Sequence, residues 1–181
     1  KIQDFMGDKD YCGQTALNGS GSIFGVRKSD FTIEVPVYIV KRGPAHWWIE
    51  LRVRSDKTWT SGYSLYIEPD GAHLRRADGT VLAERLFTPV DNGKYILRLT
   101  MNKNLIAAYV NGVIVGSEKN DTTYAAGWSG IGGGGNVNLC IDRITMRTPD
   151  GDNPASVSNS PDTIVSGRIA FTSWRYTNAD I

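Results

Sequence analysis

The sequence lacks the features that identify a membrane-spanning protein or a nucleic-acid-binding protein. No apolar run approaches the roughly 20 residues that span a bilayer, and the longest, residues 106–115, is interrupted by Asn111-Gly112. The 20 basic and 19 acidic residues leave a net charge of +1, whereas binding to phosphate backbones relies on basic residues. We therefore expect no membrane span and no nucleic-acid partner.

Cysteine and histidine are also scarce. The two cysteines, Cys12 and Cys140, are too few for a disulfide scaffold. One bridge between them and two separate thiols both agree with the sequence. The two histidines, His46 and His73, do not have the spacing of a metal site, so we expect them at the surface or in turns.

Helical periodicity is nearly absent, and strict alternation of apolar and polar residues takes its place. One face of the 31–40 segment is apolar throughout: Phe31, Ile33, Val35, Val37 and Ile39. The 47–54 segment places Trp47, Ile49, Leu51 and Val53 on one face and Trp48, Glu50, Arg52 and Arg54 on the other. Turn dipeptides such as Asp70-Gly71, Asp78-Gly79 and Asn111-Gly112 separate such segments. This pattern predicts an all-β antiparallel sandwich.

The run from Gly93 to Arg147 is the most regular part of the chain. It contains a hairpin, a Trp- and Gly-rich segment (residues 127–135) that we interpret as a connection with a backbone bend, and a final strand. In that strand the apolar positions change phase near Asp142-Arg143, which predicts a bulge. Asp142 is either a ligand or network residue, or, as we favour, the residue that caps this bend or pairs with Arg143.

The composition divides the chain into four segments. We predict an N-terminal segment (1–21), a β-sandwich (22–147), a linker rich in Pro, Ser, Asn and Asp (148–162), and a C-terminal strand or docking arm (163–181). Residues 163–176 would pack against the same chain or against other subunits. Because the chain begins at Lys1 with a polar segment, we expect a processed product or an excised piece.

Several of these segments resemble the concanavalin A-like, laminin G-like jelly-roll superfamily of lectins and glucanases. The resemblance lies in residues 95–101, the Tyr109-Val110-Asn111-Gly112 hairpin, the glycines from Gly127 to Gly135, and Ile141-Asp142-Arg143-Ile144. It covers about residues 22–147 and implies two curved antiparallel sheets. Ligands of such proteins bind on the concave face or at the loop rim.

Catalytic members of this superfamily carry paired acids on one strand, in patterns such as E-x-D-x-x-E. The strands at 47–54 and 93–101 lack such a set, and Glu34 and Glu50 stand alone. Hydrolysis of a glycosidic bond needs two carboxylates at a defined separation. We therefore expect no enzyme, with a glycoside hydrolase relative as a remaining alternative that would pair Glu34 with Glu50.

Sugar recognition uses flat aromatic faces together with polar groups that orient the hydroxyls. We predict a ligand site on one outer sheet face from Trp48, Tyr66, Arg52 and Glu50, with Trp59 or Trp128 at the rim. In the alternative interpretation a loop or residues 163–176 cover this face, and the aromatics are packing residues. No cofactor is expected; the resemblance also implies calcium held by loop acids, with Asp142 as the candidate metal ligand.

The sequence thus favours a non-catalytic carbohydrate-binding or adhesion module that binds a glycan or a cell-surface polysaccharide. We expect it in an extracellular setting or on a virion surface. The alternative from another class is a structural virion protein, such as a capsid decoration or fibre domain.

Overall fold

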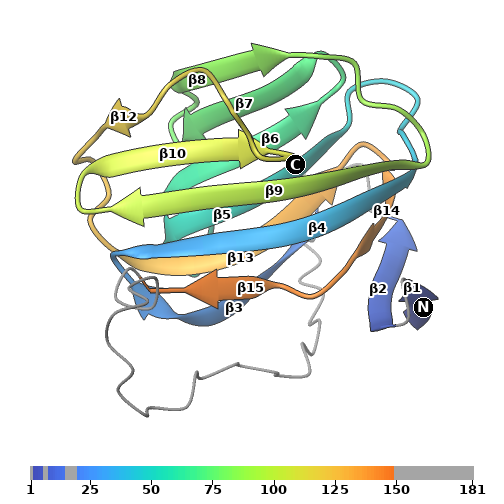
Figure 1. Ribbon diagram of the computed structural model, residues 1–181, viewed down its shortest axis with the longest axis horizontal. Coiled ribbons are helices and arrows are strands. Elements are labelled where there is room, and N and C mark those ends of the chain that lie inside the picture. Colours follow the sequence, from blue (N-terminus) through green and yellow to red (C-terminus); the bar gives the residue numbers. More distant parts are fainter. Residues whose placement is uncertain (1, 6–7, 15–19, 149–181) are drawn as a thin grey trace, which may run out of the picture.

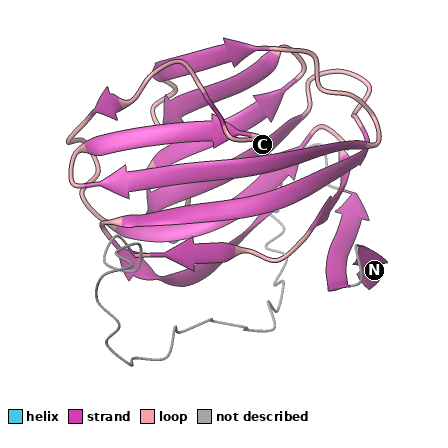
Figure 2. Cartoon of the chain, viewed as in Figure 1, coloured by secondary structure: helices cyan, strands magenta, loops and turns pink. Residues whose placement is uncertain are grey.

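The structure, a computed structural model, describes residues 2–5, 8–14 and 20–148. Every regular element in these ranges is a β-strand, as Figure 2 shows. The described part contains no helix that is long and apolar enough to cross a membrane. The linker at 148–162 and the arm at 163–181 that the sequence predicts fall, apart from Thr148, outside the described residues.

The alternating segments pair into two antiparallel sheets that lie face to face (Figure 1). The nine-stranded sheet has the order β1-β2-β14-β4-β9-β10-β11, with β12 paired to β10 and β15 paired to β4. Its strands are β1 (Ile2–Phe5), β2 (Asp8–Gln14), β4 (Phe31–Lys41), β9 (Gly93–Asn102), β10 (Leu105–Val110), β11 (Val113–Ile114), β12 (Lys119–Asn120), β14 (Asn138–Ile141) and β15 (Thr145–Arg147).

The six-stranded sheet has the order β3-β13-β5-β6-β7-β8. Its strands are β3 (Ser20–Lys28), β5 (Trp48–Ser55), β6 (Tyr63–Glu68), β7 (Gly71–Arg76), β8 (Val81–Leu86) and β13 (Gly127–Gly134). Short hairpins join β5 to β8 in sequence, so consecutive strands are neighbours in the sheet. The strands β5 to β7 lie behind β4, β9 and β10 in the view of Figure 1.

The core fills the space between the two sheets, where the alternation predicted it. Phe31, Ile33, Val35, Val37 and Ile39 of β4 are all at most 1% exposed, and Ile49, Leu51 and Val53 of β5 face them with no exposure. Burying one such side chain contributes about 1.5–3 kcal/mol. Because the apolar residues of each strand point inward, the polar residues between them must point to the outer faces.

The prediction for the Gly-rich segment was wrong. Residues Gly127–Gly134 are not a connection but the strand β13, which lies between β3 and β5. The bend comes only after it, at Gly135, whose φ of 71° is in the left-handed region that favours glycine. A glycine-rich strand has little β-propensity of its own, so pairing on both sides is what keeps these residues extended.

The predicted phase change in the final strand is present. Strand β14 ends at Ile141, opposite Val37, and β15 begins at Thr145, opposite Glu34. Three residues (142–144) therefore face only two on β4, which is the one-residue excess of a bulge. On the other side of β14, Cys140 lies opposite Cys12. Cys140 is disulfide-bonded, and the sequence contains one other cysteine, Cys12.

Candidate functional site

The outer face of the six-stranded sheet gathers polar and aromatic side chains from three neighbouring strands. We call this set the polar face: Trp48, Glu50 and Arg52 of β5, Ser64, Tyr66 and Glu68 of β6, and His73 and Arg75 of β7. The strand register brings them together, since Glu50 is opposite Tyr66, Arg52 is opposite Ser64, and Tyr66 is opposite His73. Trp48, Glu50, Arg52 and Tyr66 of the predicted site therefore share one face.

The charged residues of β5 point away from the core yet are buried. Glu50 is 5% exposed and Arg52 is 7% exposed. Both are less exposed than outward-facing residues usually are, and the ring of Trp59, in the loop between β5 and β6, lies over the Arg52 guanidinium. Arg54 is 2% exposed and does not belong to the polar face. Its φ is 51°, and its side chain reaches the carbonyl of Tyr124 in the loop between β12 and β13 and that of Lys103 in the turn between β9 and β10.

Glu50 and Arg52 form an ion pair that is held by Ser64. Arg52 Nε lies 2.5 Å from Glu50 Oε1 and 2.9 Å from Ser64 Oγ, and the Ser64 hydroxyl donates to Glu50 at 2.6 Å. Arg52 Nη2 also donates to the Tyr66 hydroxyl at 3.3 Å. Burial raises the pKa of Tyr66, and the nearby Glu50 carboxylate raises it further. These groups are therefore fixed in position before any ligand arrives.

The loop between β5 and β6 places the indole of Trp59 over Arg52. The Arg52 guanidinium lies 5.1 Å from the centre of the Trp59 ring, and Arg52 Nη1 donates to the Trp59 carbonyl. Trp59 has a φ of 62°, which is a strained backbone conformation for a bulky residue. Part of the alternative interpretation therefore holds, because a loop does cover part of the face.

Asp56 holds this loop in its strained shape. Its carboxylate accepts hydrogen bonds from the backbone amides of Thr58 (3.1 Å) and Thr60 (2.8 Å) and from the Thr60 hydroxyl. Burial would raise the pKa of Asp56, but these hydrogen bonds outweigh it and lower the pKa to about 2. The carboxylate is therefore ionised at neutral pH and keeps the Trp59 loop closed over Arg52.

The glycines of β13 and β3 make room for the aromatic rings on this face. Gly134 is opposite Trp48, and a Cβ atom at Gly134 would lie 2.3 Å from Cη2 of the Trp48 ring. A Cβ atom at Gly21 would lie 2.8 Å from Cη2 of the Trp59 ring. Both indoles therefore lie against backbone that has no side chain, and Trp48, Trp59 and Tyr66 remain half-buried.

Trp128 lies apart from Trp48. Trp128 lies near the start of β13, opposite Ser55, whereas Trp48 lies opposite Gly134 at the end of β13. These two positions are about 20 Å apart along the strand. The ammonium group of Lys57 lies 4.9 Å from the centre of the Trp128 ring. Trp128 therefore lies beside the start of the loop that carries Trp59, and it does not belong to the polar face.

Asp142 acts locally at the bulge. Its carboxylate accepts a hydrogen bond of 2.6 Å from the Arg143 backbone amide, and its own amide donates to the Pro36 carbonyl at 3.0 Å. This matches the favoured interpretation that Asp142 caps a bend. Among the described residues, Asp142 is not part of a group of three side chains close enough to hold a metal ion.

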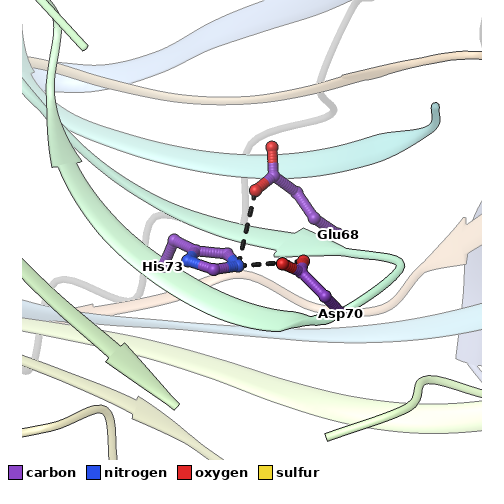
Figure 3. Close-up of side chains that lie close together, drawn as sticks. All are labelled: Glu68, Asp70 and His73. Carbon is purple, nitrogen blue, oxygen red and sulfur yellow. Dashed lines mark hydrogen bonds and ion pairs between the residues drawn. The ribbon is translucent and has the colours of Figure 1, made fainter. Parts of the chain in front are cut away.

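The sequence reasoning missed a histidine cluster at the edge of the polar face. We expected His73 at the surface or in a turn, and this was wrong. His73 is a residue of strand β7 and is only 4% exposed. Figure 3 shows its Nε2 pointing between two carboxylates, at 3.0 Å from Asp70 Oδ1 and 3.5 Å from Glu68 Oε2. The hydrogen bond from His73 lowers the pKa of Asp70. The sequence could have indicated this cluster, because Glu68, Asp70 and His73 lie close together on the two strands and the turn of one hairpin.

The two isolated glutamates of the sequence do not meet. Glu50 lies on the polar face, whereas Glu34 lies on β4 among the residues that alternate with the core set, opposite Arg98 of β9. The two side chains therefore lie on the outer faces of different sheets. They do not form the pair of carboxylates that a hydrolase would need at one glycosidic bond.

No protein-family profile and no curated protein sequence matches the chain. Solved structures do match. The carbohydrate-binding module CBM66 from Bacillus subtilis is 20% identical, with a TM-score of 0.67, and the match covers 82% of this chain and 91% of that chain. A toad ovary galectin in complex with thio-digalactose is 13% identical, with a TM-score of 0.50 and coverage of 71% and 98%.

An enzyme is also among the similar structures. The alginate lyase AlgAT5 of polysaccharide lyase family 7 is 11% identical, with a TM-score of 0.51. The match covers 71% of this chain and 61% of the lyase, so this chain spans less than two thirds of the enzyme. These likenesses, together with the two antiparallel sheets, show that the chain has the concanavalin A-like jelly-roll fold.

Proposed function

We propose that this protein is a non-catalytic carbohydrate-binding module whose ligand, a glycan or a cell-surface polysaccharide, binds on the polar face. The observation that carries the proposal is the arrangement of three half-buried aromatic rings, Trp48, Trp59 and Tyr66, around the buried Glu50–Arg52 pair. The C–H faces of sugar rings pack on such aromatic surfaces, and fixed polar groups orient the hydroxyls.

The rigidity of this arrangement supports binding. Glu50, Arg52 and Ser64 are bonded to one another, and the Trp59 loop is tied by Asp56. Groups that are already ordered lose little conformational entropy when a ligand arrives. The similarity to a carbohydrate-binding module and to a galectin supports the same proposal, because the fold is used for sugar binding in those proteins.

The positions of the glutamates support a non-catalytic role, and the disulfide supports an extracellular setting. Glu50 is neutralised by Arg52, and Glu34 is on the other sheet, so neither is placed as one of a pair of acids. The disulfide at Cys140 is typical of oxidising compartments. We therefore propose an extracellular setting, either in a secreted assembly or displayed on a surface such as that of a virion.

Removing an aromatic ring from the polar face is expected to weaken glycan binding. On a glycan array, followed by calorimetry with the best ligand, Trp48→Ala and Trp59→Ala should each raise Kd about tenfold, since a stacking contact is worth about 0.5–1.5 kcal/mol beyond the buried area. Tyr109→Ala is the matched control, because Tyr109 is a half-buried aromatic residue of β10 in the other sheet. Binding of no glycan by the wild-type protein, or an equal loss in the control, would contradict the proposal.

The glycine opposite Trp48 provides a second test that leaves every aromatic residue in place. Gly134→Ala should displace the Trp48 ring, because the three atoms nearest to the new Cβ atom all belong to that ring. We expect a several-fold rise in Kd and a small change in thermal stability. In a double-mutant cycle, Trp48→Ala with Gly134→Ala should bind no more weakly than Trp48→Ala alone. Additive losses would show that Gly134 does not act through Trp48.

A further inference from the structure

The β6–β7 hairpin gathers three side chains that can bind a transition metal, two carboxylates and one imidazole, at one point. Glu68 ends β6, Asp70 lies in the turn, and His73 points back toward both from β7 (Figure 3). One potential donor atom from each lies within 4.8 Å of the other two. The His73 side chain is only 5% exposed, so its ring is held in this orientation by the surrounding sheet.

We propose that Glu68, Asp70 and His73 bind one divalent transition-metal ion of the zinc class. Metal–ligand bonds of about 2.0–2.2 Å place neighbouring donors about 3.0–3.6 Å apart in octahedral or tetrahedral sites. The observed separations from His73 Nε2, 3.0 Å to Asp70 Oδ1 and 3.5 Å to Glu68 Oε2, fall in this range. The ion would take the place of the hydrogen bond between His73 Nε2 and the Asp70 carboxylate.

The imidazole determines which metal fits. Calcium and magnesium take oxygen ligands, whereas imidazole suits zinc, copper and nickel. The site therefore differs in both residues and chemistry from a calcium site built from turn acids alone. It also differs from the predicted metal ligand Asp142, which lies on the nine-stranded sheet after β14.

The neighbouring charges complete the site. Arg75 binds both oxygens of Glu68, at 2.8 and 2.5 Å, and so orients that carboxylate. Glu84 Oε2 lies 3.9 Å from His73 Nδ1, on the side of the ring away from the proposed ion. A carboxylate near the second nitrogen favours the tautomer that leaves Nε2 free for a metal. Three carboxylates and one guanidinium give a local charge of −2, which a divalent cation neutralises.

The exposure of the ligands leaves the ion accessible. The side chain of Asp70 is 66% exposed, whereas that of Glu68 is 21% exposed. An ion can therefore enter from the Asp70 side without unfolding of the hairpin. Three protein ligands leave at least one coordination position for water or for an oxygen of another molecule.

The test measures metal binding by the tag-free protein after treatment with a chelator. Zinc is titrated by calorimetry, and cobalt is titrated by its visible absorption, with His73→Gln, Asp70→Asn and the control His46→Gln. Because the chain has only two histidines, a histidine-dependent signal must come from His46 or His73. We expect one zinc ion per chain, at least tenfold weaker binding in His73→Gln and Asp70→Asn, and wild-type binding in His46→Gln.

The outcomes decide the proposal. No zinc binding by the wild-type protein, or an equal loss in His46→Gln, would overturn it. If His73→Gln does not fold, Asp70→Asn decides, since the Asp70 carboxylate is mostly exposed, and unchanged binding in that variant would overturn the proposal. No glycan takes part in these titrations, so their result is independent of the proposed function.

Discussion

Replacing Arg54 by methionine is expected to lower the free energy of unfolding by about 3–5 kcal/mol, because each hydrogen bond to a charged group contributes about 1.5–3 kcal/mol. Arg54 is 2% exposed and donates to three backbone carbonyls: Ser29 (2.8 Å), Lys103 (2.6 Å) and Tyr124 (3.0 Å). These carbonyls lie in three different connections, so one side chain ties together the loops at this end of the sandwich.

The charge of Arg54 is retained despite its position. Burial lowers the pKa of Arg54, and the Asp30 carboxylate, 3.4 Å from Nη2, offsets part of that shift. Methionine fills a similar volume but provides no donor, so the three carbonyls lose their partner. Some of them regain water because the loops are near the surface, which is why the expected loss is smaller than the sum of three such bonds.

Urea denaturation at pH 7 measures this prediction, with Arg147→Met as the matched control. Arg147 is an exposed arginine at the end of β15, so the same substitution there should change stability by less than about 0.5 kcal/mol. A loss below 1 kcal/mol in Arg54→Met would show that the loops are held by other contacts.

Asp121→Asn is expected to lower the free energy of unfolding by about 2–3 kcal/mol at pH 7, in the range for losing a charge-assisted hydrogen bond. Asp121 is 5% exposed and accepts hydrogen bonds from the Tyr63 hydroxyl (2.7 Å), the Thr123 amide (2.9 Å) and the Arg76 guanidinium. An asparagine retains the acceptor for Tyr63 but places an NH2 group against Arg76 or loses one of the other bonds.

The same residue predicts a pH dependence. Burial would raise the pKa of Asp121, but the hydrogen bonds from Thr123, Arg76 and Tyr63 outweigh it and hold the pKa well below its ordinary value of 3.8. A carboxyl group whose pKa is lower in the folded state stabilises that state above the unfolded value, and the stabilisation is lost as the pH falls below it. The wild-type protein should therefore lose stability as the pH falls below about 3.8.

In Asp121→Asn this loss should be smaller. It should not vanish, because the pKa of Asp56 is also lowered, to about 2. Urea midpoints at pH 7 and pH 3 measure the difference, with Glu118→Gln as the control, since Glu118 is an exposed acidic residue of the loop between β11 and β12. An unchanged pH dependence in Asp121→Asn would contradict the assignment.

The strands, and the side of each strand that forms the polar face, were predictable from the alternation of apolar and polar residues. Alternation placed Trp48, Glu50 and Arg52 opposite the core set of β5, and the short loop between β5 and β6 brought Tyr66 beside them. A period of two residues follows from the geometry of one strand, so it needs no knowledge of distant contacts. The bulge after β14 was predictable for the same reason, since it shifts that period.

Other features depended on residues far apart in sequence. The partners of Arg54 and Tyr63 include Tyr124 and Asp121, 70 and 58 positions away. Glycines that suggested a connection form the inner strand β13, because β3 and β5 pair with it on its two sides. No local propensity indicates such pairing, since the backbone of glycine fits a turn as readily as a strand.

By itself the sequence determined that this chain forms strands, which residues of the alternating strands enter the core, and which face is left to polar and aromatic groups. Only the tertiary structure decided what covers that face and which charges meet on it. The Trp59 loop lies over Arg52 because Gly21 on another strand leaves room for the indole. His73 reaches Glu68 and Asp70 because the hairpin register places it there. Alternation sets the direction of a side chain, whereas its burial and its partners depend on the packing of distant segments.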